Sequence, residues 1–237
     1  IPVLSDYLVK QVPTTVDEQV GDKILKEIPA DAIDFEKTKL VQEFFNEIVL
    51  EGKTKIIVAK VPIFNAFALP GNTIVVFDKV LQSVHSYPEL AALLAHEYSH
   101  IKNRHGMRSL AHEQLRQLIA DGLFGGASKS DDFINGSNKI LTSKKSRGFE
   151  KQADLEGLEL LRKNKIDEQG FLQLLTTIQY IESSEKIAPN INSIFSDYFS
   201  THPPTKDRIE FIESKITSSN NYEPHDKLDS LFKQITE

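Results

Sequence analysis

The sequence predicts an α+β fold that is mostly helical and contains one small antiparallel sheet. Two segments rich in isoleucine and valine, residues 55–61 and 72–77, have the composition of strands. The link between them ends in Leu69-Pro70-Gly71, which is typical of a turn. Apolar residues recur at helical spacing through most of the remaining chain. We therefore expect two strands that pair antiparallel, with helices packed around them.

The composition indicates a globular protein with one sizeable core. The chain has 237 residues, of which 40% are hydrophobic and 26% are charged. We interpret residues 1–237 as a single domain. Residues 1–52 are expected to form an N-terminal helical scaffold, residues 53–217 the core that carries the chemistry, and residues 218–237 a C-terminal tail.

Charge and cysteine content narrow the range of partners. The formal net charge is −6, with lysine and arginine scattered among acidic residues, so no basic surface is expected to bind nucleic acid. The chain has no cysteine. A metal ion would therefore have to be bound by histidine and carboxylate side chains.

The start of the chain suggests processing. The first residue is Ile1 and the only methionine is Met107, so we expect an N-terminal segment, either a signal peptide or a membrane anchor, to have been removed. No stretch approaches the roughly 18 consecutive apolar residues that a membrane-spanning helix needs. We expect the residues that are present to be soluble.

Two helices are expected before the first strand. One runs from Thr15 to about Glu27 and opens with a capping box between Thr15 and Glu18. The other covers about residues 35–50 and ends before Gly52. Both are interpreted as scaffold.

A long helix follows the second strand. Ser86 and Glu89 have the spacing of a capping box, Pro88 suits the first turn, and the helical pattern continues to about Arg104. Residues 90–95 are apolar on all sides of this helix, which places it at the centre of the protein.

The C-terminal half is predicted to be helical around a polar segment. Residues 125–146 are rich in Gly, Ser, Asp, Asn and Lys, so we interpret them as a surface loop and a candidate lid. Helices are expected over about residues 147–163, 168–183 and 205–216. The tail beyond residue 218 is polar until a short amphipathic end.

Residues 96–100 of the central helix read HEYSH, an HExxH sequence. At 100° per residue, His96 and His100 lie about 40° apart on one face, so both imidazoles can bind one metal ion. Glu97 lies beside them, where a carboxylate can activate a bound water molecule. The spacing supplies two ligands and a base, and a zinc hydrolase needs one more ligand.

The histidines that follow His100 closely in the sequence do not provide the third ligand. In the metzincin arrangement the third ligand would stand at position 106, which is Gly106. His105, on a continuous helix, would point about 180° away from His96. We interpret His105 as a residue that supports the site from outside or faces solvent.

Two carboxylates offer an alternative. Glu150 and Asp154 are one helical turn apart and share a face. Glu150 can complete the ligand set, while Asp154 can accept the outer N–H of a ligand histidine and fix its tautomer. The competing interpretation is a solvated acidic face balanced by Arg147 and Lys151.

Four motifs together resemble the gluzincin family of the CAAX prenyl proteases and HtpX-like proteases, especially its soluble bacterial-envelope and mitochondrial quality-control branches. In order, they are NAFALPG at 65–71, HEYSH at 96–100, SRGFE with a following Ala-Asp pair at 146–154, and STHPP with an arginine at 200–208. Ser99 and Asn72 stand where the family often has glycine. The match covers about residues 65–208.

The resemblance implies a zincin-type metallopeptidase domain with its sheet beside the HExxH helix. It implies one Zn²⁺ per chain bound by His96, His100 and Glu150, with Glu97 as general base. It also places His202 near the active site, where it would steady an oxyanion or approach the metal in a resting state, and Arg208 near the loop that carries His202. Asp154 would support a ligand histidine. We hypothesise that residues 65–69, including Asn65, Ala66, Phe67 and Ala68, form an exposed strand edge that pairs with an extended substrate.

The function expected from these motifs is zinc-dependent cleavage of unfolded or misfolded polypeptides. We expect a quality-control role in the bacterial envelope, in the periplasm, with a membrane or lipid anchor in the removed segment as an alternative to a free protein. Three other functions compete with this one. A zinc aminopeptidase would carry glutamate at position 119, which is Ile119. A chaperone-like client-binding protein would be expected to lack a ligand or the base, and a prenylated-peptide protease to have intervening membrane helices.

Overall fold

The computed structural model describes residues 2–50, 53–124, 146–184, 202, 206–216 and 222–237. The α+β class and the helical majority are confirmed. The strands are β1 (Lys55–Ala59), β2 (Ala66–Leu69) and β3 (Thr73–Phe77). The helices are α1 (Pro2–Gln11), α2 (Thr14–Leu25), α3 (Phe35–Ile48), α4 (Asp78–Leu81), α5 (Tyr87–Lys102), α6 (His105–Phe124), α9 (Arg147–Lys163), α10 (Gln169–Ser184), α12 (Lys206–Glu213) and α13 (Asp226–Thr236), with a short 3₁₀ turn at Ala30–Ala32.

The sheet is mixed, in the order β1-β3-β2. The two segments predicted as strands, now β1 and β3, pair in parallel, so the expected antiparallel pairing between them is wrong. The reason is a third strand in the link between them. Residues 66–69 form β2, which reverses the chain and pairs antiparallel with β3 across the Pro70–Asn72 turn. In this turn Gly71 has φ 81° and Asn72 has φ 69°, a conformation that asparagine tolerates better than most residues.

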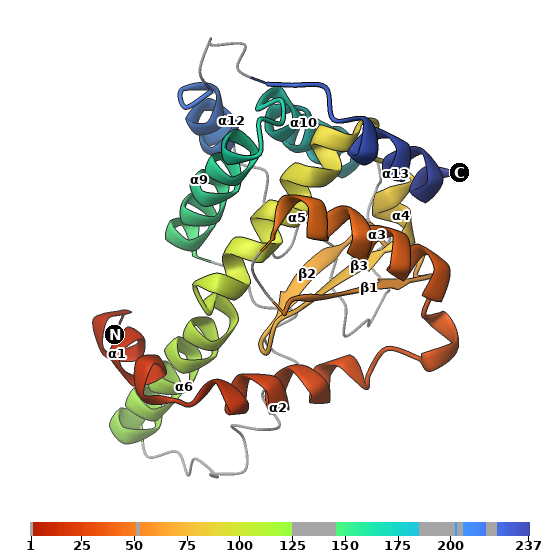
Figure 1. The fold of residues 1–237 in the computed structure, drawn as a ribbon. Helices are drawn as coiled ribbons and strands as arrows, with labels where there is room; N and C mark the ends of the chain where they lie inside the picture. The colour runs from red at the N-terminus through yellow and green to blue at the C-terminus, as the bar shows by residue number, and fades with distance from the viewer. Residues whose placement is uncertain (1, 51–52, 125–145, 185–201, 203–205, 217–221) are drawn as a thin grey trace.

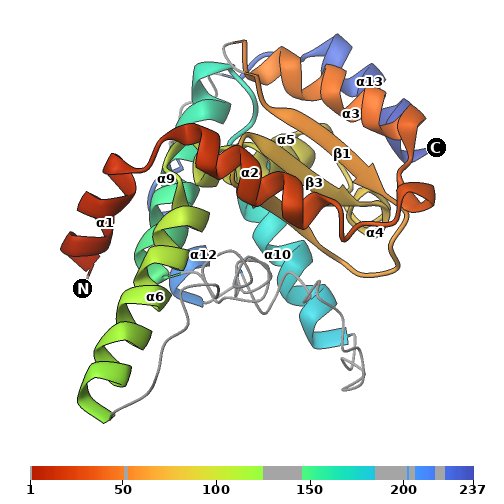
Figure 2. The same ribbon diagram turned by 90° about the horizontal axis from the view of Figure 1, so that it is seen from below.

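The sheet separates two apolar clusters. Figures 1 and 2 show α3 on one face of the sheet and α2 on the other. Alternate residues of one face, including Ile56 and Ile74, belong to a cluster with residues of α3 and α5, and α13 packs on those two helices. The opposite face, including Val75 and Phe77, packs against Ile24 of α2. This alternation is the two-residue period of a strand with both faces buried.

Helix α5 crosses the centre of the molecule, with α9 and α10 packed along it (Figure 1). Every residue from Leu90 to Ala95 is buried, as the sequence predicted. Ser86 caps the helix by accepting a hydrogen bond from the Glu89 backbone N–H. The Glu89 carboxylate accepts the His85 backbone N–H and the Thr177 hydroxyl, which joins the start of α5 to α10.

The chain turns sharply at the end of α5. The helix ends at Lys102, and Arg104 adopts a left-handed conformation with φ 51°. Its guanidinium donates two hydrogen bonds to Asp17 and two more to the backbone carbonyls of Val9 and Val12. The N-terminal helices thereby hold the residue that breaks α5 and starts α6 in a new direction.

Several local predictions need correction or lie outside the described residues. Helices α1 and α6 were not predicted, and α2 begins at Thr14 after Pro13 without a side-chain cap, so the proposed Thr15 capping box is not formed. The candidate lid, residues 125–146, falls outside the described part of the chain except for its last residue, Ser146, which caps α9. Among the described residues, no helix combines the length and apolarity needed to cross a membrane.

Gly157 permits the close packing of α9 on α5. A Cβ at this position would lie 2.8 Å from Cε2 of Phe171 and 3.3 Å from the backbone nitrogen of His96. We expect Gly157→Ala to lower the free energy of unfolding by about 1–3 kcal/mol, because overpacking outweighs the gain in helix propensity. Urea denaturation measures this change.

The matched control is Gly148→Ala in the same helix. There an added Cβ would meet only Ser146 Oγ, at 3.9 Å. This variant should be as stable as the parent or more stable by up to roughly 1 kcal/mol. Equal stability of the two variants would contradict the packing account.

Candidate metal centre

The HExxH residues lie on the buried side of α5. His96 and His100 are 1% and 2% exposed, and their Nε2 atoms are 3.1 Å apart. One helical turn separates the two residues, so the backbone geometry brings both imidazoles to one point. Two imidazole nitrogens therefore converge at one buried point.

Glu150 and His202 complete the cluster. Glu150, on the first turn of α9, places Oε1 3.4 Å from His100 Nε2 and Oε2 3.6 Å from His96 Nε2. His202 Nδ1 lies 3.1 Å from Glu150 Oε2 and 3.2 Å from His96 Nε2. One ligand atom from each of the four buried residues fits within a mutual distance of 4.8 Å.

The geometry of this cluster fits a bound zinc ion. Two ligands at about 2.1 Å from a tetrahedral zinc are roughly 3.4 Å apart, and the His96 and His100 nitrogens are 3.1 Å apart. Three carboxylates, from Glu97, Glu150 and Asp154, are buried beside the Arg208 guanidinium, which is the buried arginine in the part of the chain that the structure describes. With the imidazoles neutral, as metal binding requires, these four groups sum to minus two, which a divalent cation would neutralise.

Asp154 and Arg208 support the cluster from outside. Asp154 Oδ1 lies 3.0 Å from His96 Nδ1, the nitrogen that faces away from Glu150. Arg208, from α12, donates two hydrogen bonds to Asp154 and lies 3.0 Å from Glu150 Oε2. It also donates to the His202 backbone carbonyl, at 3.3 Å. The solvated-face interpretation of the two acidic residues is therefore wrong, because both are buried and paired.

The electrostatics follow from this pairing. Burial lowers the pKa of His96, but Asp154 and Glu150 more than offset it and raise that pKa to about 9. Burial raises the pKa of Glu150, and the His202, His100 and His96 imidazoles bring it well below its usual value. Burial likewise opposes the Arg208 guanidinium at Asp154, whose pKa is lowered overall. Both carboxylates are thus ionised at neutral pH.

Glu97 faces the sheet and His202. Its Oε2 accepts the backbone N–H of Ala68 at 2.9 Å, and its Oε1 lies 3.7 Å from His202 Nε2. The base candidate is therefore positioned by the edge strand β2. The Glu97 and His202 side chains are both 0% exposed.

The predicted substrate edge is at the edge of the sheet but is not exposed. Strand β2 pairs only with β3 among the described strands, which leaves its other side toward α5. Asn65, Ala66, Phe67 and Ala68 have exposed fractions of 2%, 0%, 5% and 8%. The expectation of an exposed edge is wrong for this conformation, because α5 and the residues around the site cover the strand.

His105 was placed incorrectly by the assumption of a continuous helix. Because α5 ends at Lys102, the chain turns His105 back, so that its Nδ1 lies 2.8 Å from Nδ1 of His100. The residue is completely buried. It supports the site from outside, one of the two alternatives considered, and does not face solvent. Asn103, a frequent helix-ending residue, was the available signal.

Two histidines one turn apart, an adjacent glutamate and a glutamate from a second helix form a metallopeptidase-type centre. A model of peptidase family M48 matches residues 36–216. The chain belongs to peptidase family M48, which confirms the resemblance to the CAAX prenyl and HtpX-like proteases.

Curated relatives agree with this family. Mitochondrial metalloendopeptidase OMA1 of Saccharomyces cerevisiae is 26% identical over 166 residues, covering 68% of this chain and 46% of the relative. A protease HtpX homolog of Salinibacter ruber is 31% identical over 178 residues, 63% of each chain. The beta-barrel assembly-enhancing protease of Yersinia pestis is 30% identical over 126 residues, 47% of this chain and 26% of the relative. The chain spans less than two thirds of the length of each.

The pKa of His96 predicts how the metal-free protein responds to pH. The folded-state pKa, about 9, is above the ordinary value of 6.5, so this imidazole contributes stability that is complete below pH 6.5 and is lost as the pH rises through 9. For chelator-treated protein we expect the free energy of unfolding to fall by about 3 kcal/mol between pH 6 and pH 9.5.

The control is His96→Asn, measured in the same way. This variant lacks the ionisable group and should show little of that decrease. The account of the site would be contradicted if the parent and the variant had the same pH dependence over this interval.

Proposed function

We propose that this protein is a zinc-dependent endopeptidase whose ligands are His96, His100 and Glu150. The observation that carries the proposal is the convergence of these three side chains, all buried, beside the Glu97 carboxylate. Bound zinc would supply Lewis-acid chemistry and lower the pKa of a water ligand to about 7. Family membership supports the same class of hydrolase.

Glu97 is proposed to move the proton. Its carboxylate would accept a proton from the attacking water and pass it to the leaving amine. The Ala68 N–H holds one oxygen of Glu97, at 2.9 Å, so the carboxylate is oriented before the reaction. His202 is proposed to lie beside the developing oxyanion, or near the metal in a resting state, because its Nε2 is 3.7 Å from Glu97 and its Nδ1 is within the ligand cluster.

The edge strand is proposed to bind extended polypeptide. The Asn65 carbonyl accepts the Phe77 N–H, so Asn65 and alternate residues of β2 pair with β3, while Ala66 and Ala68 direct their backbone groups to the other side. A substrate strand would add there through main-chain hydrogen bonds to Ala66 and to the Ala68 carbonyl, since the Ala68 N–H already donates to Glu97. Recognition through the main chain suits unfolded proteins with little side-chain preference. The buried edge would have to be uncovered first.

The proposed role is quality control of misfolded envelope or membrane proteins in the bacterial periplasm. The similarity to an HtpX homolog, to OMA1 and to the beta-barrel assembly-enhancing protease supports this role. The complete burial of His96, Glu97, His100 and His202 favours one second candidate, a latent enzyme or client-binding zinc protein that is inactive until the site opens.

Glu97→Gln tests the proposed base. We expect this variant to retain about one zinc per chain and to lose 10²- to 10⁴-fold or more of the rate at which the parent cleaves casein, because the amide cannot accept a proton. Zinc content is measured by elemental analysis and cleavage by release of soluble peptides. Zinc-loaded parent that cleaves nothing would support the latent candidate, and parent without zinc would refute the metal site.

Backbone methylation of a peptide substrate tests the proposed edge. N-methyl groups on alternate residues should raise KM at least about tenfold when those amides face β2, because each removes one inter-strand hydrogen bond. Shifting the methyl groups by one residue provides the control and should change KM much less. Equal effects of the two methylation patterns would argue against strand addition.

A further inference from the structure

The outer nitrogen of His100 starts a chain of hydrogen bonds that runs through the interior to a carboxylate. His100 Nδ1 lies 2.8 Å from His105 Nδ1, and His105 Nε2 lies 3.3 Å from the Gln152 side-chain carbonyl, Oε1. The Gln152 amide nitrogen then donates to Asn103 Oδ1 at 2.8 Å and to Glu156 Oε1 at 2.9 Å. This series of hydrogen bonds, called the relay below, connects the end of α5, the start of α6 and the middle of α9.

Groups that can only accept hydrogen bonds determine which atoms of the relay donate and which accept. The Asn103 amide nitrogen donates to the Ser99 backbone carbonyl at 2.9 Å and to Glu156 Oε2 at 3.0 Å, so Asn103 Oδ1 must face Gln152. Gln152 can meet Asn103 Oδ1 and Glu156 only with its amide nitrogen. Its carbonyl is therefore left for His105, and the proton of His105 must be on Nε2.

The position of the proton on His105 determines the tautomer of His100. With its proton on Nε2, His105 presents the lone pair of Nδ1 to His100. His100 must then carry its own proton on Nδ1, since two lone pairs at 2.8 Å would repel each other. The Nε2 atom of His100, which faces His96 and Glu150, then carries no proton, as a metal ligand requires.

We propose that His105 and Gln152 are positioning residues that hold His100 in the one neutral tautomer able to bind the metal. This inference rests on the proposed zinc site. His96 receives the corresponding support from Asp154, a charged acceptor at 3.0 Å. The two ligand imidazoles are thus oriented by different means, one by a carboxylate and the other by a neutral histidine and amide.

The His105 ring is held firmly enough for this role. It is fully buried and stacks on Phe149, with ring centroids 4.3 Å apart and an interplanar angle of 10°. The Arg108 guanidinium lies 4.4 Å from the centroid of the same Phe149 ring. The left-handed Arg104, paired with Asp17, fixes the backbone on its N-terminal side.

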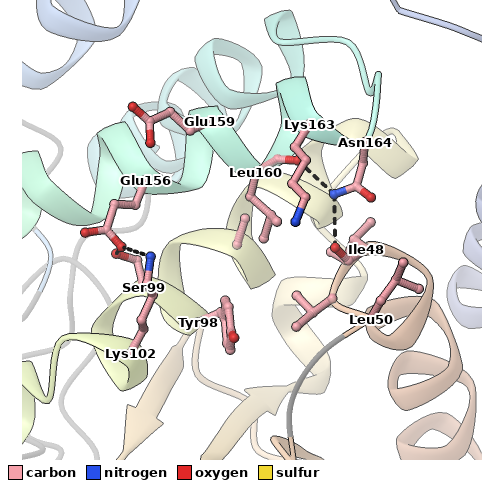
Figure 3. A pocket seen from close by; sticks show the side chains of 12 residues that line it. Ile48, Leu50, Tyr98, Ser99, Lys102, Glu156, Glu159, Leu160, Lys163 and Asn164 are labelled. Atoms are coloured by element: carbon pink, nitrogen blue, oxygen red, sulfur yellow. Dashed lines mark hydrogen bonds and ion pairs between the residues drawn. The ribbon is translucent and has the colours of Figure 1, made fainter.

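The terminal carboxylate remains charged. Burial raises the pKa of Glu156, but hydrogen bonds from Gln152, Asn103 and Lys102 lower it overall. Figure 3 shows Glu156 beside Ser99 and Lys102 at one end of a cleft of about 370 Å³ between α5, α9 and the end of α3. The relay therefore runs from the buried metal site to a carboxylate that is 22% exposed.

Zinc affinity tests the proposal through three variants. His105→Phe keeps an aromatic ring on Phe149 but removes the acceptor, and should weaken zinc binding about 10- to 100-fold. His105→Asn restores an acceptor close to the position of Nδ1 and should bind zinc within about threefold of the parent. His112→Phe, also on α6 and next to Phe149, is the matched control and should leave the affinity unchanged.

Affinities are measured by competition with a chromophoric chelator, and the free energy of unfolding of each metal-free variant is measured in urea. The proposal is supported if His105→Phe binds zinc more weakly than the parent and His105→Asn restores the affinity. The metal-free variants should be equally stable. Parent that binds zinc with the same affinity as His105→Phe would overturn the inference alone. Parent that binds no zinc would overturn the proposed function instead.

Nitrogen NMR of the imidazoles gives a second readout that does not depend on any variant folding. The sequence contains seven histidines, so the spectrum of the zinc-loaded protein has few imidazole signals to assign. We expect His100 protonated at Nδ1 and His105 protonated at Nε2. A His105 signal from the Nδ1-protonated or doubly protonated form would refute the relay.

Discussion

The balance of buried charge between α5, α9 and α12 is the constraint on which the site depends. The carboxylates of Glu97, Glu150 and Asp154 are buried together with the Arg208 guanidinium. Buried carboxylates are costly unless they are paired and hydrogen-bonded, so Arg208 must reach both Asp154 and Glu150, and it does. The remaining negative charge favours a cation where the imidazole nitrogens converge.

Distant parts of the chain serve this arrangement. Gly157 lets α9 approach α5 closely enough for Glu150 to reach the two histidines. Strand β2 orients Glu97 through the Ala68 N–H, and α2 holds Arg104 in the turn that returns His105 to His100. The N-terminal helices, which looked like scaffold in the sequence, therefore contribute to the geometry of the candidate metal centre.

The sequence predicted the parts of the site that depend on spacing within one helix. His96, Glu97 and His100 share a turn of α5, and Glu150 and Asp154 share a turn of α9, so period alone placed each group. Contacts between elements that are distant in the sequence could not be predicted from helical or strand periodicity. The burial of β2 and the parallel pairing of β1 with β3 depend on how the chain returns, and His105 was misplaced because one left-handed residue, Arg104, ended the helix.

X-ray absorption of the zinc-loaded protein tests the central claim most directly. The account predicts about four nitrogen or oxygen ligands at roughly 2.0–2.1 Å, including at least two imidazoles, and one zinc per chain. Loss of imidazole scattering in a variant lacking His96 and His100 would assign the site. A shell without imidazole, or a spectrum unchanged in that variant, would contradict the account.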